Sequence, residues 1–139
     1  MTTLETCEFI ARIAHKGQSD KSGKPYIQHP LTVAKGVETE DEKCVALLHD
    51  VLEDSNFTAE DLRSANIPEQ VIVAVEILTH KDGVSYDDYI TEIKKNDLAR
   101  KVKMSDLKHN MDLSRLEAVT EKDLQRKEKY ERAYQVLTS

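Results

Sequence analysis

The apolar residues of this chain recur every three or four positions, which is the spacing of amphipathic α-helices. The pattern predicts an all-α protein with seven or eight helices and no strand. Thr2 with Glu5 and Thr58 with Asp61 have the spacing of capping boxes, so these pairs mark two helix starts. The helical patterns cover residues 2–17, 30–37, 39–54, 58–67, 68–80, 85–96, 97–113 and 121–137.

The segments between these patterns are short, which predicts a single domain over residues 1–139. Residues 18–30 are polar and contain Gly23 and Pro25, so they predict a loop. No repeat, low-complexity segment or linker rich in Pro, Gly or Ser divides the chain. The inward face of the last helix is expected to consist of Leu124, Tyr130, Ala133, Tyr134 and Leu137.

Composition narrows the possible partners. Only four glycines and three prolines occur, which favours helices, and a net charge of −6 argues against a large basic face for nucleic acid. A local Lys/Arg pocket for a phosphorylated small molecule remains compatible with this charge. The N-terminal residues include acids and no long apolar run, so neither a signal peptide nor a membrane span is expected. Cys7 and Cys44 occupy apolar positions, as buried free thiols of a cytoplasmic protein do. Nothing in the sequence indicates the oligomeric state.

The helical pattern over residues 39–54 carries one compact polar side. At about 100° per residue, His49, Asp50, Glu53 and Asp54 fall on the side opposite the apolar residues. One interpretation is an ordinary amphipathic helix with a solvated acidic face. The histidine favours a second interpretation, a metal site, because crowded acids repel one another unless a cation or retained protons compensate them.

A metal site needs ligands from other segments, and the sequence offers two candidates. His29 follows the polar loop in "PYIQHP", and Asp106 lies in "VKMSDLKHNM" with Asn110 four residues later on the same stripe. A mixed imidazole and carboxylate set suits Mn²⁺, Fe²⁺, Zn²⁺ or Mg²⁺. The predicted ligands are His29, His49, Asp50 and Asp106, and Glu53 and Asp54 are left for proton transfer.

This arrangement of a lone His, an adjacent His-Asp pair and a distant Asp resembles the signature of HD-domain metal-dependent phosphohydrolases. "AHKGQSDKSGKPYIQHP", "ALLHDVLEDS" and "KMSDLKHNM" look like successive motifs of the hydrolase domain of RelA/SpoT-type stringent-response proteins and of small alarmone hydrolases. The resemblance runs from about residue 10 to 113. It implies a compact multi-helix HD-domain fold. It also implies hydrolysis of the 3′-pyrophosphate of guanosine tetra- and pentaphosphate, usually with Mn²⁺.

The same resemblance assigns roles to individual residues. It makes the four predicted ligands the metal-binding set and gives Glu53 and Asp54 the task of orienting or deprotonating the attacking water. Asn110 and Lys21 match substrate-contacting positions of the family. The family's synthetase region has no counterpart in the chain, so we expect no synthetase activity.

Two positions depart from the family's pattern. Asp20 stands where the family usually has an arginine, and Asp112 stands where it tends to have a base. The altered base pocket motivates an alternative, an HD phosphohydrolase acting on another nucleotide or phosphorylated metabolite. A third hypothesis, from a different class, is a non-catalytic metal- or nucleotide-binding module.

Three further residues near these motifs have weaker signals. His15 lies at the end of the first helical pattern, and we interpret it as a structural residue or as one that supports the site residues from behind. His109 is one position away from Asn110, so we expect it to point to solvent. Tyr26 either packs the loop or lines the pocket, and the sequence favours neither.

Overall fold

The computed structural model describes all 139 residues and contains only helices and connections. Nine α-helices and one short 3-10 helix are present, and an isolated bridge between Ser19 and Pro25 is the only extended pairing. The predicted all-α class is therefore confirmed. The elements are α1 (Thr3–Ala14), α2 (Gln28–Lys35), α3 (Glu40–Leu48), α4 (Val51–Asp54), α5 (Ala59–Ser64), α6 (Glu69–Leu78), α7 (Tyr86–Lys94), α8 (Asp97–Met111), η1 (Leu113–Arg115) and α9 (Glu121–Thr138).

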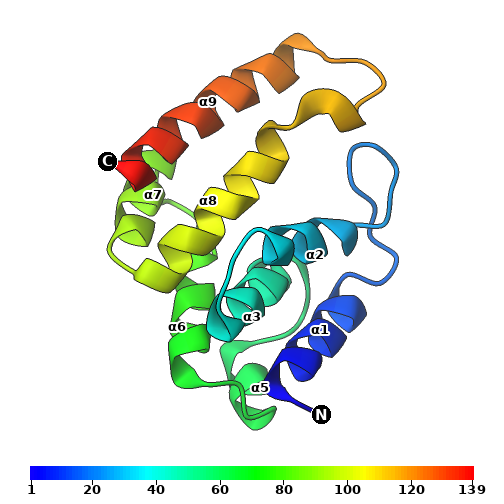
Figure 1. Cartoon of the computed structure of the whole chain (residues 1–139), viewed down its shortest axis with the longest axis vertical. Coiled ribbons are helices and arrows are strands. Elements are labelled where there is room, and N and C mark those ends of the chain that lie inside the picture. Colours follow the sequence, from blue (N-terminus) through cyan, green and yellow to red (C-terminus); the bar gives the residue numbers. More distant parts are fainter.

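Helix α3 is the central element of the fold. It packs against α1, α2, α6 and α8, and α9 lies along α8 and α7 (Figure 1). All five residues from Cys44 to Leu48 are at most 3% exposed, because neighbouring helices cover α3 on every side over this stretch. The C-terminal end of α3 is therefore embedded in the core. Any side chain placed there has a fixed position.

The helix predicted over residues 39–54 is broken in two, which corrects the sequence prediction. His49 ends α3, and Asp50 adopts φ −105° and ψ 0° before α4 begins at Val51. The Ala46 carbonyl, which a continuous helix would pair with the Asp50 N–H, accepts a hydrogen bond from His49 Nδ1 at 2.5 Å. The imidazole thus competes with the helical ladder, and the chain changes direction at the His-Asp pair.

A close approach of α2 to α8 brings two distant parts of the sequence together. A Cβ on Gly36 would collide with Ser105 Oγ, and this hydroxyl donates to the Val33 carbonyl at 2.9 Å. Glycine at the end of α2 permits this contact. The packing holds His29, at the start of α2, against Asp106 in the middle of α8.

The polar loop between α1 and α2 lies beside the α8–α9 connection at one end of the molecule (Figure 1). Gly23, with φ +82°, turns this loop. The loop predicted over residues 18–30 is correct up to Ile27 and wrong beyond it, because α2 begins at Gln28. An ion pair of 3.5 Å between Arg115 Nη1 and Asp20 Oδ2 links the two segments. These irregular segments form the mouth of the cavity described below.

The predicted capping boxes at Thr2 and Thr58 are both present, and Thr39 and Thr120 form two more. The prediction for the inward face of α9 is correct for Ala133 and Leu137, which are buried. It is wrong for Leu124, which is 45% exposed. Its neighbour Asp123 is buried in its place, because its carboxylate accepts hydrogen bonds from the N–H and hydroxyl of Thr120.

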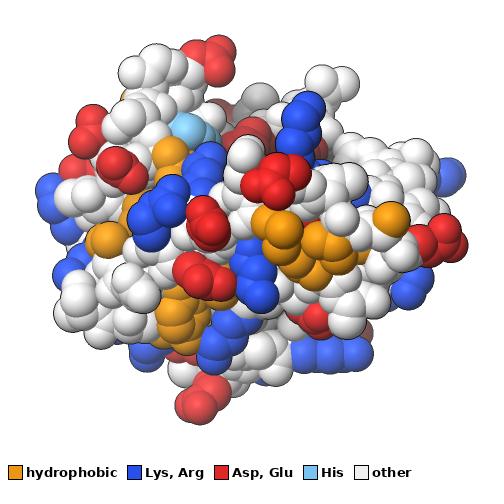
Figure 2. All heavy atoms as spheres, turned by 90° about the horizontal axis from the view of Figure 1, so that it is seen from above, with side chains coloured by type: hydrophobic (Ala, Val, Ile, Leu, Met, Phe, Trp, Pro, Cys, Tyr) orange, Lys and Arg blue, Asp and Glu red, His pale blue; other side chains and the backbone are white.

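Acidic and basic side chains are interspersed on the face drawn in Figure 2, with apolar patches between them and no basic stripe. Cys7 and Cys44 are buried and carry free thiols, as predicted. None of the helices has the length and apolarity that crossing a bilayer requires.

The Glu42 carboxylate binds the backbone just before α3. Its replacement by Gln tests how much the negative charge at this helix start contributes to stability. The carboxylate is buried and accepts the N–H groups of Glu38 and Thr39 at 3.0 and 3.4 Å. Burial by itself raises the pKa of Glu42, but these N–H groups outweigh it and lower the pKa. We expect Glu42→Gln to lose about 1 kcal/mol of unfolding free energy at pH 7, measured by urea denaturation.

The sign of the pH dependence follows from the lowered pKa. The extra unfolding free energy of the wild type over Glu42→Gln is fully present above about 4.3, the pKa of a Glu in the unfolded chain. It disappears as the pH falls through the lower pKa of Glu42 in the folded protein. Glu92→Gln on the exposed face of α7 is the control, with a change below about 0.5 kcal/mol. A Glu42→Gln deficit that stayed constant from pH 7 to acid would contradict the assignment.

Candidate functional site

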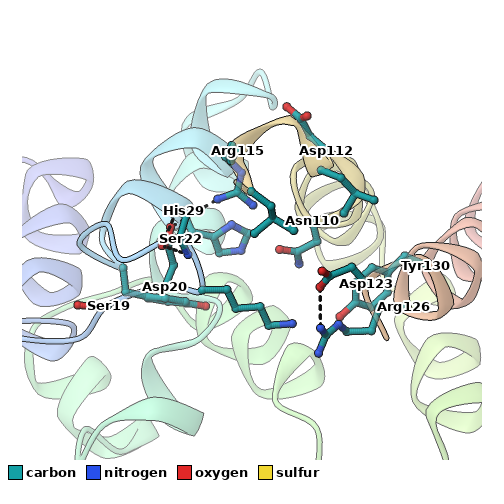
Figure 3. A pocket seen from close by; sticks show the side chains of 14 residues that line it. Ser19, Asp20, Ser22, His29, Asn110, Asp112, Arg115, Asp123, Arg126 and Tyr130 are labelled. Atoms are coloured by element: carbon teal, nitrogen blue, oxygen red, sulfur yellow. Dashed lines mark hydrogen bonds and ion pairs between the residues drawn. The ribbon is translucent and has the colours of Figure 1, made fainter. Parts of the chain in front are cut away.

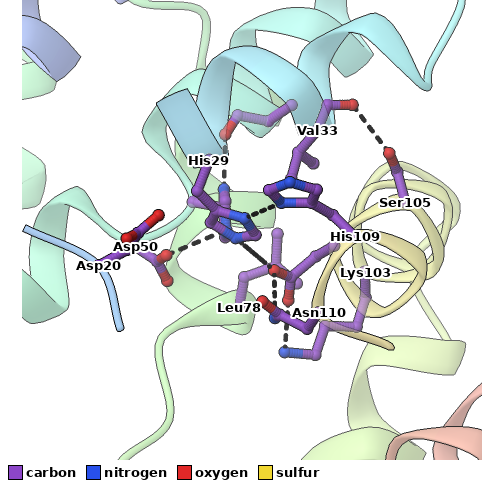
Figure 4. A network of polar contacts seen from close by, with 12 residues as sticks. Asp20, His29, Val33, Asp50, Leu78, Lys103, Ser105, His109 and Asn110 are labelled. Atoms are coloured by element: carbon purple, nitrogen blue, oxygen red, sulfur yellow. Dashed lines mark hydrogen bonds and ion pairs between the residues drawn. The ribbon is translucent and has the colours of Figure 1, made fainter. Parts of the chain in front are cut away.

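The four predicted metal ligands converge from three parts of the fold, and Figure 4 shows His29 and Asp50 within the polar network at this point. His29 begins α2, His49 and Asp50 form the junction of α3 and α4, and Asp106 lies on α8. One donor atom each of His29, His49 and Asp50 lies within 4.8 Å of the others. Asp106 Oδ1 is 2.7 Å from His29 Nε2 and 3.5 Å from His49 Nε2. Both histidines and Asp106 are at most 5% exposed, so this is a buried cluster.

His49 is held in the tautomer that metal ligation requires. Because Nδ1 carries the proton donated to the Ala46 carbonyl, Nε2 of the neutral ring carries the lone pair. Nε2 is buried and has no hydrogen-bond partner, although Asp50 Oδ2 lies 3.1 Å away. The Asp50 carboxylate is close to Nε2, but the angle between the two groups does not allow a hydrogen bond. A lone pair and carboxylate oxygens that face a common point fit a divalent cation.

Charges around the cluster keep Asp106 ionised. Lys103 Nζ lies 2.9 Å from Asp106 Oδ2, and Asn110 Nδ2 donates to Oδ1 at 3.1 Å. Burial raises the pKa of Asp106, but Lys103 and His29 outweigh it and hold the pKa well below its usual range. Burial likewise lowers the pKa of His49, yet Asp50 and Asp106 outweigh it and raise the pKa. Without a cation, protons and Lys103 therefore compensate the carboxylates.

Tyr26 lines the cavity beside His29, which is one of the two alternatives that the sequence left open, and it also supports the Asp50 carboxylate. Its hydroxyl donates to Asp50 Oδ2, and burial raises the pKa of Tyr26, as does the nearby Asp50. The ring also packs against His15, whose own ring lies 4.8 Å away between centroids. His15 Nδ1 contacts Gln18 Oε1 at 2.9 Å, in line with its interpretation as a structural residue. In metal sites a ligating carboxylate usually accepts a hydrogen bond from a residue that does not itself bind the metal.

His109 does not point to solvent, and this prediction was wrong. Its Nδ1 lies 2.6 Å from His29 Nδ1, and the two rings stack with centroids 4.9 Å apart. Burial and the facing His29 lower the pKa of His109 to about 4, so the ring is neutral at pH 7. Residues three apart share a helix face, so the spacing between Asp106 and His109 was the signal that sequence reasoning missed.

Glu53 and Asp54 lie one turn beyond the ligand pair, on the short helix α4. Both are exposed, and Glu53 Oε1 accepts the backbone N–H of His80 at 2.8 Å. Partial burial, together with Asp50 and Glu53, raises the pKa of Asp54. Neither carboxylate lines the cavity beside His29, so their predicted role in proton transfer remains a prediction.

A cavity of about 290 Å³ adjoins the buried cluster at His29 (Figure 3). Its walls come from the α1–α2 loop, the end of α8, η1 and α9. The two predicted substrate-contacting residues, Lys21 and Asn110, both line it. Asn110 also donates to Asp106, so one amide touches both the cluster and the cavity. Arg115, Arg126 and Tyr130 are among the lining side chains that sequence reasoning did not assign to the site.

The two acids that depart from the family's pattern also line the cavity, but turns of the backbone engage them. Asp20 Oδ1 accepts from the N–H and hydroxyl of Ser22 and from the Lys24 N–H, at 2.7 to 3.0 Å. Asp112 Oδ1 accepts from the N–H and hydroxyl of Ser114 and so begins η1. Each acid therefore shapes its segment.

The sequence of the chain is similar to those of several known enzymes. No family model matches the sequence. The chain is 34% identical over 116 residues to the guanosine-3′,5′-bis(diphosphate) 3′-pyrophosphohydrolase of Haemophilus influenzae, a match that covers 73% of this chain and 17% of that protein. It is 31% identical over 121 residues to the GTP pyrophosphokinase of Streptomyces coelicolor, covering 78% of this chain and 14% of that protein. The chain thus spans less than a fifth of the length of these curated relatives.

One solved structure, from work entitled "A metazoan ortholog of SpoT hydrolyzes ppGpp and plays a role in starvation responses", has the same fold. The TM-score is 0.77 at 21% identity, and the match covers 99% of this chain and 85% of that chain. The helical fold and the buried His and Asp cluster define an HD-type domain with a candidate site for a divalent metal. Together with the sequence relatives, they show that the chain belongs to the HD-type RelA/SpoT hydrolase domains.

The buried pair of Lys103 and Asp106 yields a prediction on stability. Lys103→Met leaves the Asp106 carboxylate buried without its ammonium partner, which costs about 3 kcal/mol of unfolding free energy. Because the lost ammonium also repels a cation, we expect added Mn²⁺ to stabilise the variant more than it stabilises the wild type. Urea denaturation with and without Mn²⁺ measures both effects.

Lys95→Met, at a side chain that is 68% exposed, is the matched control and should change stability by less than about 0.5 kcal/mol. The assignment of Lys103 as the counter-charge fails if its removal costs no more than this control, or if Mn²⁺ stabilises both proteins equally.

Proposed function

We propose that the chain hydrolyses the 3′-pyrophosphate of guanosine 3′,5′-bis(diphosphate) and of its pentaphosphate analogue, releasing pyrophosphate and GDP or GTP, with Mn²⁺ as the metal. The observation that carries the proposal is the buried Nε2 atom of His49, which has no hydrogen-bond partner and lies 3.1 and 3.5 Å from carboxylate oxygens of Asp50 and Asp106, next to a cavity of about 290 Å³. The names of several curated relatives support the choice of substrate.

We assign the metal to His29, His49, Asp50 and Asp106. Two neutral imidazoles and two carboxylates form the mixed nitrogen and oxygen set that Mn²⁺ accepts. Tyr26 orients Asp50, and the Ala46 carbonyl fixes the tautomer of His49. Such a metal lowers the pKa of bound water toward neutrality and polarises a phosphoryl oxygen.

The remaining steps belong to residues of the chain itself. Asp54, whose pKa is raised, accepts a proton from the attacking water, and Glu53 beside it orients that water. Asn110 joins the cluster to the cavity and positions the substrate, and Lys21 attracts its phosphates. Because phosphoryl transfer depends mainly on positioning and charge neutralisation, this set of groups is sufficient for the reaction.

Hydrolysis with the purified protein tests the proposal directly. Incubation with guanosine 3′,5′-bis(diphosphate) and Mn²⁺ should yield GDP and pyrophosphate, resolved by ion-exchange chromatography, and EDTA should abolish the reaction. His49→Gln should lose bound Mn²⁺ by elemental analysis together with activity, because the amide lacks the imidazole nitrogen that would hold the metal. No product from the wild type with Mn²⁺ verified in the protein would refute the proposal. A parallel incubation with ATP and GTP tests the expectation of no synthetase activity.

Substitution of the acidic pair separates chemistry from metal binding. Asp54→Asn should lower kcat by about 10²- to 10⁴-fold, the usual contribution of a general base, while Mn²⁺ binding remains within twofold of the wild type. Glu53→Gln should lower kcat less, because it orients the water and does not accept the proton. Asp61→Asn, on the neighbouring helix α5, is the control. If Asp54→Asn keeps the kcat of the wild type, Asp54 is not the general base. If neither protein releases product although both bind Mn²⁺, the alternative of a non-catalytic binding module gains support.

A second candidate function is phosphohydrolysis of another nucleotide or phosphorylated metabolite. The observation that favours it is the position of Asp20 and Asp112 on the cavity wall. A substrate panel that includes adenine, guanine and pyrimidine nucleotides separates the two candidates by kcat/KM. Buried free thiols at Cys7 and Cys44 support a reducing, cytoplasmic location for either activity.

A further inference from the structure

Three basic side chains line the cavity beside His29, and they differ in how completely they are paired with acidic or hydrogen-bonding groups of the protein. Arg126 Nη2 makes a short ion pair of 2.9 Å with Asp123 Oδ1. Lys21 is exposed, and its amine has no hydrogen-bond or ion-pair partner within the protein. Arg115 reaches over the cavity from η1 toward Asp20 (Figure 3). It is the one basic group that is both partly buried and incompletely paired.

The guanidinium of Arg115 has hydrogen-bonding capacity that the protein does not use. Its contact with Asp20 Oδ2 is 3.5 Å long, well beyond the 2.7–2.9 Å of a charge-assisted hydrogen bond. Its Nε is buried and has no partner. A guanidinium offers five donors in a planar fork, and a buried donor without a partner is costly. The arrangement therefore calls for an acceptor supplied by a ligand.

The charge around Arg115 indicates what kind of acceptor fits. Asp20 lies close enough to neutralise the guanidinium, and its other oxygen is fixed by Ser22 and Lys24. The wall as a whole carries three acids and three bases, so its formal charges balance: Asp20, Asp112 and Asp123 against Lys21, Arg115 and Arg126. A wall with balanced charge and spare donors favours a neutral planar group with adjacent acceptors over a further anion.

We infer that Arg115 is a specificity-determining residue that donates to the O6 and N7 acceptors of a 6-oxopurine, and that Asp20 positions it. This inference rests on the proposed function, because it takes the cavity as the seat of the nucleotide's base. Guanine and hypoxanthine both present two acceptors on this edge, which match the fork of an arginine. Adenine presents a donor in place of O6 and is disfavoured.

Binding of GDP, IDP and ADP to the Mn²⁺-loaded protein, followed by calorimetry, tests the inference without any need for hydrolysis. The three ligands share the same phosphates, so their own affinity for Mn²⁺ cancels in the comparison. The wild type should bind GDP and IDP about 5- to 100-fold more tightly than ADP. Arg115→Ala should remove this preference by weakening GDP and IDP while ADP changes little.

Three further variants sharpen the test. Arg115→Lys should not restore the preference, since a lysine supplies the charge without the fork. Asp20→Asn keeps an acceptor for the loop but removes the charge, so the preference should fall by a smaller factor. Arg12→Ala, at an exposed pair with Glu8 on α1, should leave all three affinities unchanged.

Several results would overturn the inference. They are equal binding of GDP and ADP by the wild type, an equal loss for all three ligands in Arg115→Ala, which indicates a phosphate contact, and full recovery in Arg115→Lys. Failure of the proposed function is a separate result. A wild type that prefers GDP and IDP but releases no pyrophosphate from guanosine 3′,5′-bis(diphosphate) loses the hydrolase assignment and keeps the role of Arg115.

Discussion

The hydrogen bond from His49 Nδ1 to the Ala46 carbonyl is the interaction on which the rest of the site depends. It ends α3, turns the chain at Asp50 and leaves Nε2 of the ring directed at the cluster. Since α3 is buried from Cys44 to Leu48, the imidazole takes its position from the packed core. A ligand held in this way loses little conformational entropy when a metal binds, which is the basis of a preorganised site.

The cluster also has a charge balance that fits its proposed substrate. Asp50 and Asp106 are ionised carboxylates in a buried setting, and Lys103 compensates only one of them. Buried charge is costly unless it is paired, so the remaining negative charge favours a cation. With a divalent ion the two carboxylates, the lysine and the metal together carry a single positive charge. That net charge suits an anionic phosphoryl group at the edge of the cavity.

The sequence predicted the helices and the convergence of His29, His49, Asp50 and Asp106 because both leave local patterns. Helical periodicity and capping boxes identify helices, and a His-Asp pair followed by distant His and Asp residues identifies the cluster. The break at His49 escaped prediction, since it arises from a side chain that competes with the helical ladder, whereas periodicity only records the apolar face. The basic residues of the cavity also escaped, because Arg115 and Arg126 reach the cavity only through the packing of η1 and α9 beside the α1–α2 loop.

Chemistry and recognition are built on different kinds of structure. The cluster sits at ends and faces of packed helices, whereas the cavity wall consists largely of the α1–α2 loop and η1, each shaped by an aspartate that accepts hydrogen bonds from its own turn. Such segments tolerate substitution better than a buried helix, because few core contacts depend on them. Asp20 and Asp112 have therefore altered the wall without disturbing the cluster, and the guanidinium facing the cavity comes from Arg115, three residues beyond Asp112. An exchange of loop charges would thus change the cavity wall and leave the buried cluster in place.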